Sequence, residues 1–430
     1  MPDADPEAPE PGRPLRQGFT TGTAAAAACK AALLRMLTGK CPDIVETPLP
    51  TGERLGVPVE SAKAQDGSGW ASVVKDAGDD PDATNGARIV CRATLAPWPP
   101  EGDAGRGHGS ASRSPGDVLC VTIEGGQGVG RVTLPGLPVA VGEAAINPAP
   151  RAQIEAAARE ALEGVSGQVR LVVEVENGRE IARHTLNPRL GIEGGISILG
   201  TQGIVKPYSH AAWRATIDQS LSVARAGGLV TAAFSTGRRS ERLLMAWRPD
   251  LPDLAFVQAA DFFAHALREA VRRGFSQIVW GCFFGKLAKM AQGLAYTHAR
   301  TEPTDFALLA DLAARAGADE QACRAVRGAN TARHALEIVP EGSVRDRFAA
   351  LTAQAALAAA VGFARLPAGE AGDLPDPHGL GQGSGRSPAS RGDGTPAARD
   401  QKEGGPSGGP RIEIVCFGFD EAVLARAYTS

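Results

Sequence analysis

The fold is decided by residues 187–205, which read Asn187-Pro-Arg-Leu-Gly-Ile-Glu-Gly-Gly-Ile-Ser-Ile-Leu-Gly-Thr-Gln-Gly-Ile-Val205. The β-branched residues favour strands, and the glycines permit tight turns and the close approach of a ligand or another backbone. Ser209 precedes a segment with helical apolar periodicity, so a helix is expected soon after the last glycines of this stretch. A strand, a glycine turn and a helix hold many nucleotide-like ligands. The alternative is a glycine-rich junction between two domains, and no Gly-x-Gly-x-x-Gly fingerprint names a ligand.

Length and composition limit the classes of protein to which the chain can belong. Its 430 residues allow roughly one to three domains, each able to bury a core. The net charge of -3 and the scattered Lys and Arg residues argue against a nucleic-acid partner. The seven cysteines form no C-x-x-C pair, so neither a disulfide framework nor a metal site is predicted. Without a signal-peptide pattern or an apolar run of roughly 18–20 residues, no membrane span is predicted, and a cytoplasmic protein is expected.

An α+β domain with a mixed sheet is predicted for residues 15–186, after a disordered leader at 1–14. A Gly/Pro/Ser-rich insertion at 97–116 is expected to be a flexible loop. Alternating apolar and polar residues predict strands at 57–62, 70–75, 88–95, 118–124 and 129–134. An amphipathic helix is predicted at 151–163. The dipeptide Asn177-Gly178 predicts a β-hairpin with strands at 168–175 and 180–184.

Three threonines, Thr20, Thr21 and Thr23, precede an alanine-rich run that is predicted to form a helix ending at Gly39. Thr21 or Thr23 is expected to be its N-cap. The hydroxyls and the free N–H groups of the first turn lie where an anion could bind. Ordinary capping, which needs only one threonine, is the alternative.

A Rossmann-like α/β domain with C-terminal helices is predicted for residues 187–366, because strands and helices alternate there. Strands are expected at 229–234, 254–258 and 277–283, and helices at 209–226, 239–246, 261–273, 286–291, 305–316, 319–338 and 343–363. Residues 367–410, rich in Gly, Pro, Ser and Arg, cannot bury a core and are predicted to be a disordered insertion. Residues 411–430 are expected to return to the sheet edge as a strand followed by a short helix.

An acidic segment, Lys75-Asp76-Ala77-Gly78-Asp79-Asp80-Pro81-Asp82, lies between two predicted strands. Carboxylates packed this closely repel one another unless they are solvated, hydrogen-bonded to backbone or facing a cation. One carboxylate with a raised pKa would serve as a general base. An Asx-rich turn is the structural alternative.

A second glycine turn, at Gly281 and Gly285, superficially resembles a P-loop. Only three residues separate these glycines, and Leu287 stands where a Ser or Thr would hold magnesium, so phosphoryl transfer is poorly supported. Lys286 and Lys289 lie three apart on one helix face, which suits a ligand that carries carboxylates. His298 follows as a candidate base, although a lone histidine is more often structural.

Taken together, these stretches resemble the CbiD family, the cobalt-precorrin-5B C-1 methyltransferases of cobalamin biosynthesis. The resemblance covers roughly residues 15–300 and the last strand. The segments that carry it, in the family's order, are 15–23, 75–81, 128–133, 142–148, 185–205 and 285–291 with Thr297-His298. The insertions at 97–116 and 367–410 fall outside the family pattern. The E-x-G-x-G motif of many methyltransferases is missing, so pattern alone does not indicate the methyl donor.

The resemblance implies S-adenosylmethionine as methyl donor and a cobalt-bearing polycarboxylate tetrapyrrole as acceptor. Cobalt then arrives with the substrate, in agreement with the lack of a predicted metal site. A base is needed only if a proton leaves, and the candidates are Asp79, Asp80 and His298. The residues expected to bind the donor are Gly194, Gly195, Gly200, Thr201, Gly203, Gly281 and Gly285. Those expected to meet the acceptor's carboxylates are Thr20, Thr21, Thr23, Lys75, Arg189, Lys286 and Lys289.

A non-catalytic tetrapyrrole carrier on the same scaffold is the alternative function. It predicts tight binding of the macrocycle and no affinity for S-adenosylmethionine. Neither reading specifies whether the chain forms a homo-oligomer.

Overall fold

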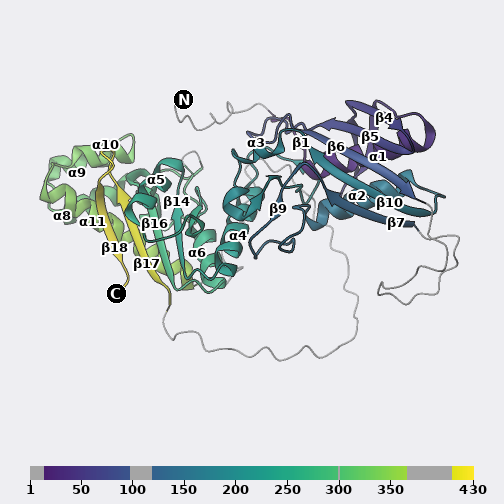
Figure 1. The fold of residues 1–430 in the computed structure, drawn as a ribbon. Helices are drawn as coiled ribbons and strands as arrows, with labels where there is room; N and C mark the ends of the chain where they lie inside the picture. Colours follow the sequence, from purple (N-terminus) through teal and green to yellow (C-terminus); the bar gives the residue numbers. More distant parts are fainter. Residues whose placement is uncertain (1–13, 97–118, 299–300, 366–408) are drawn as a thin grey trace, which may run out of the picture. The chain divides into compact units, whose positions relative to one another are not determined.

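The computed structural model describes residues 14–96, 119–298, 301–365 and 409–430 and divides the chain into two compact units, Met1–Ala212 and Trp213–Ser430 (Figure 1). Helices and sheets occur in both units, so the protein is of the mixed α/β class, as expected. The division comes later than the boundary expected before Asn187. The insertions predicted at 97–116 and 367–410 and the leader at 1–14 lie almost entirely outside the described residues.

The first unit is built on a five-stranded mixed sheet in the order β4-β5-β6-β10-β7. Its strands are β4 (Ser61–Gln65), β5 (Ser68–Val74), β6 (Arg88–Ala96), β10 (Gly167–Val175) and β7 (Leu119–Gly125). Helices α1 (Thr21–Thr38) and α2 (Pro148–Ala161) pack against each other, and α1 also packs on β5 and β6. The alanine run and Gly69 of β5 let α1 approach the sheet closely. The approach is so close that a Cβ at Gly69 would lie 2.1 Å from the Ala32 carbonyl oxygen.

The glycine-rich stretch 187–205 belongs to the first unit and pairs with three segments of it. After the 3₁₀ turn η1 (Pro188–Leu190), β11 (Ile192–Glu193) pairs with β9 (Arg131–Val132). Strand β12 (Gly195–Ile196) pairs with β8 (Gly128–Val129), and β13 (Ile204–Val205) pairs with β1 (Gly18–Phe19). The separate pair β2 (Ile44–Pro48) and β3 (Arg54–Pro58) completes this unit's strands within the described ranges. The stretch is thus held by short backbone pairings on both sides of its glycine turns.

The hairpin predicted at Asn177-Gly178 is wrong. Strand β10 ends at Val175, and residues 178–182 form the short helix α3 (Gly178–Ala182). Because β10 already pairs with β6 on one edge and β7 on the other, a hairpin partner would have no free edge to join. Asn177 does adopt the left-handed conformation (φ 54°) that made the dipeptide look like a hairpin turn, but it begins a helix.

The second unit contains a sheet in the order β15-β14-β16-β17-β18. Strands β14 (Thr231–Ser235), β15 (Phe256–Gln258), β16 (Gln277–Phe283) and β17 (Arg411–Phe417) are parallel, and β18 (Val423–Tyr428) is antiparallel. Strand β17 is therefore internal instead of the expected edge strand, and β18 stands where a short terminal helix was predicted. Residues 423–428 alternate between solvent and core, which suits a strand.

Helices cover this second sheet on both faces. Helix α5 (Arg238–Trp247) packs on one face through Leu243 and Leu244. The larger core lies on the other face and includes residues of α4 (His210–Ala226), α6 (Phe263–Arg272) and α7 (Phe284–Ala291). Helices α8 (Phe306–Ala316), α9 (Glu320–Arg327), α10 (Ala332–Ile338) and α11 (Ser343–Arg365) extend it (Figure 1). One helix predicted at 319–338 is thus two.

Within the described ranges, α11 is the one helix whose length and composition would allow it to cross a membrane. Its Phe348, Ala349, Ala353, Ala356 and Ala360 are buried in the larger core of the second unit. A core helix passes the same test of length and composition, and this packing accounts for the apolar face of α11.

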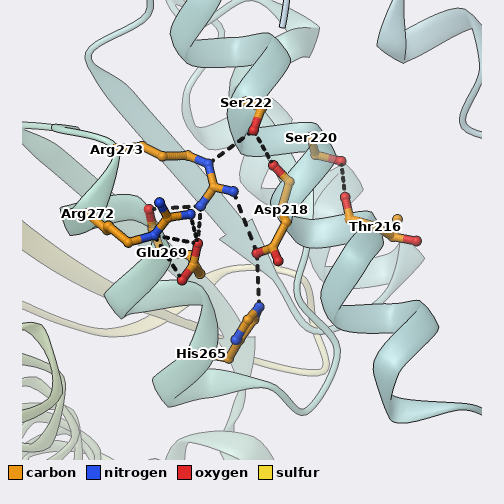
Figure 2. Close-up of polar contacts among 8 residues, drawn as sticks. All are labelled: Thr216, Asp218, Ser220, Ser222, His265, Glu269, Arg272 and Arg273. Atoms are coloured by element: carbon orange, nitrogen blue, oxygen red, sulfur yellow. Dashed lines mark hydrogen bonds and ion pairs between the residues drawn. The ribbon is translucent and has the colours of Figure 1, made fainter. Parts of the chain in front are cut away.

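A polar network joins α4 to α6, as Figure 2 shows. Arg273, directly after α6, donates to Ser222 Oγ (3.1 Å) and pairs with Glu269, and its Nη2 lies 3.9 Å from Asp218 Oδ1. The same Asp218 oxygen lies 3.0 Å from His265 Nε2. Burial raises the pKa of Glu269, but the hydrogen bonds from Arg272 and Arg273 outweigh it and leave the pKa below its ordinary value. These contacts fix the register of the two helices.

A Glu160→Gln variant tests how far ion pairing holds the first unit together. Glu160 of α2 accepts two hydrogen bonds from Arg54 (both 2.8 Å) and one from Lys30 of α1 (2.5 Å). Hydrogen bonding from Arg54, with a smaller contribution from Lys30, lowers the pKa of Glu160 from 4.5 to about 2. A depressed pKa stabilises the fold above pH 4.5, and this stabilisation is lost as pH falls towards about 2.

The expected cost of Glu160→Gln at neutral pH is about 1–2 kcal/mol of unfolding free energy, after allowance for solvent screening of a side chain that is one-third exposed. Urea denaturation of both proteins across that pH range measures it. A difference in stability that does not shrink on acidification would contradict the ion-pair account.

Candidate functional site

The acidic segment, here called the aspartate loop (residues 75–82), follows β5 in the first unit. Lys75 is 2% exposed, and its Nζ lies 2.5 Å from Asp82 Oδ2. Arg16 pairs with Asp76 and donates its backbone N–H to Asp79 Oδ2 (2.8 Å). Asp76, Asp79 and Asp82 therefore each lie against a cation or a backbone donor, which offsets the repulsion expected from the sequence.

Asp80 differs from the other carboxylates of the aspartate loop. It is half-buried and accepts the backbone N–H of Tyr208 (2.9 Å). Burial, assisted by the charge of Asp82, raises the pKa of Asp80 above its ordinary value, despite the opposing effects of the Tyr208 hydrogen bond and Lys75. Tyr208 itself adopts the left-handed conformation (φ 56°), a local strain that clusters at functional sites. Asp80 is thus the carboxylate in this loop best suited to accept and release a proton.

The anion site predicted at the start of α1 is filled by the chain's own backbone. Thr20, rather than Thr21 or Thr23, is the N-cap and accepts the N–H of Thr23 (3.2 Å). The Thr21 hydroxyl accepts the N–H of Leu199 (2.9 Å) and lies within reach of two carbonyls of the glycine-rich stretch. Thr23 donates to the Gly203 carbonyl (2.8 Å). The Thr21 and Thr23 hydroxyls thus hold residues 197–203 on α1, while the Thr20 hydroxyl caps the helix.

The same packing explains several glycines that were assigned to the donor. A Cβ at Gly195 would lie 2.0 Å from the Gly128 carbonyl oxygen, and one at Gly200 would lie 2.4 Å from Thr20 Oγ1. Gly203 has a positive φ (83°) and lies against Thr23 and Leu49. Three others in this region are more accessible: Gly194 and Thr201 are exposed, and Arg189 is half-buried in η1.

In the second unit, polar side chains gather where parallel strands end. Lys286, in the first turn of α7 directly after β16, pairs with Asp261, which follows β15. The Thr297 hydroxyl donates to the same Asp261 oxygen (3.0 Å). Because the carboxyl ends of parallel strands meet at one edge of a sheet, three segments converge there on one ion pair.

Lys289 and His298 lie in the same region. Lys289 is buried, and its Nζ donates to the backbone carbonyls of His298 (2.9 Å) and Glu302. Burial lowers the pKa of Lys289. His298 stacks on Tyr296 with ring centroids 5.9 Å apart. Lys289 therefore supports the backbone around His298, whereas the half-buried Lys286 forms the ion pair with Asp261.

The remaining glycines of the second turn have different environments. Gly281 lies within β16, where a Cβ would lie 3.1 Å from atoms of Leu244. Gly285, in the first turn of α7, is exposed and would have no neighbour within 4 Å. A ligand could approach the backbone at Gly285 but not at Gly281.

The structure groups the predicted residues by unit. Asp79, Asp80 and Lys75 share the aspartate loop. The threonines lie at the start of α1, against the glycine-rich stretch. Lys286, Lys289 and His298 share the sheet edge of the second unit. Sequence reasoning missed Asp261 and Ser235, although Ser235 ends the apolar strand β14, Asp261 follows β15, and a helix begins shortly after each. That position is where parallel sheets carry ligand-binding groups.

Fold and site define a mixed α/β protein whose second unit carries charged groups at the carboxyl ends of parallel strands, a class that includes many enzymes with nucleotide-like ligands. The chain belongs to the CbiD family. The CbiD family model matches residues 8–207, and the model of the CbiD C-terminal domain matches residues 296–370.

Relatives are similar over most of their length. A protein of Nitratidesulfovibrio vulgaris named cobalt-precorrin-5B C(1)-methyltransferase is 53% identical over 350 residues, covering 79% of this chain and 85% of that protein. A protein of the same name from Geobacillus kaustophilus is 45% identical, covering 78% and 85%. A solved cobalamin biosynthesis protein (cbiD) from Archaeoglobus fulgidus is 28% identical, covers 63% of this chain and 78% of that chain, and gives a TM-score of 0.33.

Proposed function

We propose that this chain methylates C-1 of cobalt-precorrin-5B to give cobalt-precorrin-6A in the anaerobic-type route to cobalamin, with S-adenosylmethionine as donor. The observation that carries the proposal is 53% identity to a protein with this activity in its name, along 85% of that protein's length. Cobalt enters as part of the substrate. Within the described residues no group of three or more His, Cys, Asp and Glu could hold a metal ion. A cytoplasmic location fits a biosynthetic enzyme of this kind.

Catalysis of this reaction depends mainly on how the methyl donor and the acceptor ring are positioned. The S–CH₃ bond of the sulfonium breaks and its electron pair stays on sulfur, while an electron pair of the ring carbon forms the new C–CH₃ bond. Sulfonium and ring carbon must be held within about 3–3.5 Å in line. The ring gains one positive charge, which loss of a proton from the ring removes. The donor becomes a neutral thioether.

We assign proton acceptance to Asp80 among the three candidate bases. Asp79 and Asp80 each accept one backbone N–H, from Arg16 and Tyr208, so that contact does not separate them. His298 lies in a segment supported by Lys289. The raised pKa of Asp80 brings it closer to a working range for proton transfer than an ordinary aspartate.

The sheet of the second unit supports a Rossmann-like assignment for the donor's domain. Its parallel strands run in the order second, first, third, fourth along the chain, which is the flavodoxin-like doubly wound order. From β14 the next strand in sequence, β15, is added on one side, and the following strands, β16 and β17, are added on the other. The order of the strands therefore reverses between β14 and β16, and ligands bind outside the carboxyl ends of the strands at such a point. Gly285 and Lys286 lie at this edge.

A Lys286→Met variant is expected to weaken binding of cobalt-precorrin-5B about tenfold and leave donor affinity within about twofold, because a lost cation matters most to a polycarboxylate. Lys289→Met is the control: its ammonium serves backbone carbonyls, so its loss should lower stability instead. Calorimetric titration with each ligand and thermal unfolding separate the two effects. Equal loss of both affinities in Lys286→Met would contradict the assignment.

Calorimetry of the unmodified protein with S-adenosylmethionine and S-adenosylhomocysteine tests the proposed function at the binding level. Micromolar binding is the expected result. If neither ligand binds, even with the cobalt tetrapyrrole present to allow for ordered binding, the non-catalytic carrier becomes the better account.

A further inference from the structure

The carboxyl end of β14 lies at the point where the strand order reverses in the sheet of the second unit. Strand β14 pairs with β15 on one side and with β16 on the other, and Ser235 lies opposite Gly281 of β16. The connection from β14 to α5 is only Thr236-Gly237. A strand, a short glycine turn and a helix N-terminus therefore follow one another at this edge. None of these residues has a role in the proposed function.

Helix α5 has an open N-terminus. It is 10 residues long, and no side chain caps it. The Ser240 hydroxyl turns back to accept the Thr236 N–H (3.1 Å). Within the described ranges, the backbone N–H groups of Arg238 and Arg239 donate no hydrogen bond. Uncapped N–H groups and the helix dipole make such an end favourable for an anion.

Two arginines open this helix and differ in what they contact. The Arg239 guanidinium lies over the Phe283 ring (5.0 Å to the centroid) and donates to the Phe419 carbonyl (3.0 Å). Arg238 is exposed and makes no ion pair or hydrogen bond within the part of the chain that the structure describes. The first residue of α5 thus offers an uncommitted positive charge beside the open helix end.

Ser235 supplies an independent observation. The residue is 1% exposed, and its hydroxyl has no hydrogen-bond partner among the described residues. Ala233, two residues earlier, packs with Leu243 and Leu244 of α5, so strand alternation places the Ser235 side chain on the α5 face as well. A buried hydroxyl without a partner is costly, and a site that binds a ligand is a common reason to keep one.

From these groups we infer a carboxylate-binding site at the carboxyl end of β14, formed by the Ser235 hydroxyl, the open N-terminus of α5 and the Arg238 guanidinium. The identity of its ligand rests on the proposed function, which supplies two sources of carboxylate: the amino-acid part of the methyl donor, and an acetate or propionate group of the tetrapyrrole. Glu241 is buried one turn into α5 and accepts a hydrogen bond from Gln258 (2.6 Å). A carboxylate one turn beyond an anion site also suits the ammonium group of an amino acid.

The test uses the full chain with Ser235→Ala, Arg238→Gln and the double variant. Arg242→Gln is the matched control, because Arg242 lies one turn along the same helix and is paired with Glu421 (2.6 Å). Each protein is titrated by calorimetry with S-adenosylhomocysteine, with methylthioadenosine (which lacks the amino-acid part), and with cobalt-precorrin-5B. Thermal unfolding is recorded without ligand.

The double variant should lose roughly 10- to 100-fold in affinity for one carboxylate ligand, as expected for charge-assisted hydrogen bonds. Loss for S-adenosylhomocysteine but not methylthioadenosine assigns the site to the donor; loss for cobalt-precorrin-5B alone assigns it to the acceptor. Unfolding temperature should be unchanged or higher, because removal of an unpartnered buried hydroxyl does not destabilise. Affinities equal to those of Arg242→Gln would overturn the inference and leave the proposed function standing, whereas an unmodified protein that binds no ligand would refute both.

Discussion

An Asp80→Asn variant is expected to lower kcat for methylation of cobalt-precorrin-5B by about 10²–10⁴-fold, the usual contribution of a positioned general base. The backbone hydrogen bond from Tyr208 can be kept by the asparagine carbonyl, so the fold of the aspartate loop should survive the change. Affinity for the donor should stay within about twofold, because the amide replaces only the proton acceptor.

The pH dependence makes this prediction specific. Asp80 must be deprotonated to accept a proton, so kcat should rise with pH through its pKa, and burial places that pKa above the ordinary value of 3.8. This rise should vanish in Asp80→Asn. Asp79→Asn is the matched control, because Asp79 accepts one backbone N–H as Asp80 does but is not the assigned base, so its variant should keep the rise. A similar loss of kcat in both variants would point to damage of the loop and not to loss of a base.

An Asp82→Asn variant should lower the unfolding free energy of the first unit by about 3–5 kcal/mol, the cost of leaving a buried charge without its partner. The Lys75 side chain is 1% exposed, and its ammonium lies 2.5 Å from Asp82. Although burial alone would raise it, the pKa of Asp82 is lowered by Lys75. The pair therefore stabilises the fold at neutral pH and loses this contribution as pH falls through the lowered pKa.

A double variant, Lys75→Met with Asp82→Asn, distinguishes an ion pair from a general loss of packing. Removing both charges removes the unpaired ammonium, so much of the stability lost in Asp82→Asn should return. Guanidinium denaturation, monitored by a signal from the first unit, measures the unfolding free energy of each variant. Lys75 was predicted to bind the acceptor's carboxylates; if it does, the double variant should bind cobalt-precorrin-5B less tightly even where its stability is restored.

Local sequence signals predicted most of the helices and strands. The alanine-rich helix ends at Gly39 in the left-handed conformation, as expected, because glycine adopts it without a Cβ clash. Strand β16 has the predicted bounds, Gln277–Phe283. Failures came from tertiary contacts: both edges of β10 are occupied, so Asn177 begins a helix in place of a hairpin. Pairing partners far along the chain leave no signal in a single segment.

The candidate site was predictable as a list of residue types but not as a set of contacts. Lys286 and the aspartate loop stood out because charged residues follow apolar strands. The sequence could not show that Thr20, Thr21 and Thr23 bind the chain's own backbone, or that Asp261 pairs with Lys286 across 25 positions. Nor could it single out Asp80 among neighbouring aspartates, because its pKa depends on burial and on Tyr208, far along the chain.

Methyl transfer to C-1 of cobalt-precorrin-5B is the activity proposed for this chain. The most direct test incubates the purified protein with cobalt-precorrin-5B and S-adenosylmethionine carrying an isotope-labelled methyl group, and follows the product by mass spectrometry and NMR. We expect one labelled methyl group on C-1 and one S-adenosylhomocysteine per product molecule. A tetrapyrrole that binds tightly but is recovered without label would contradict the proposal and identify the protein as a carrier.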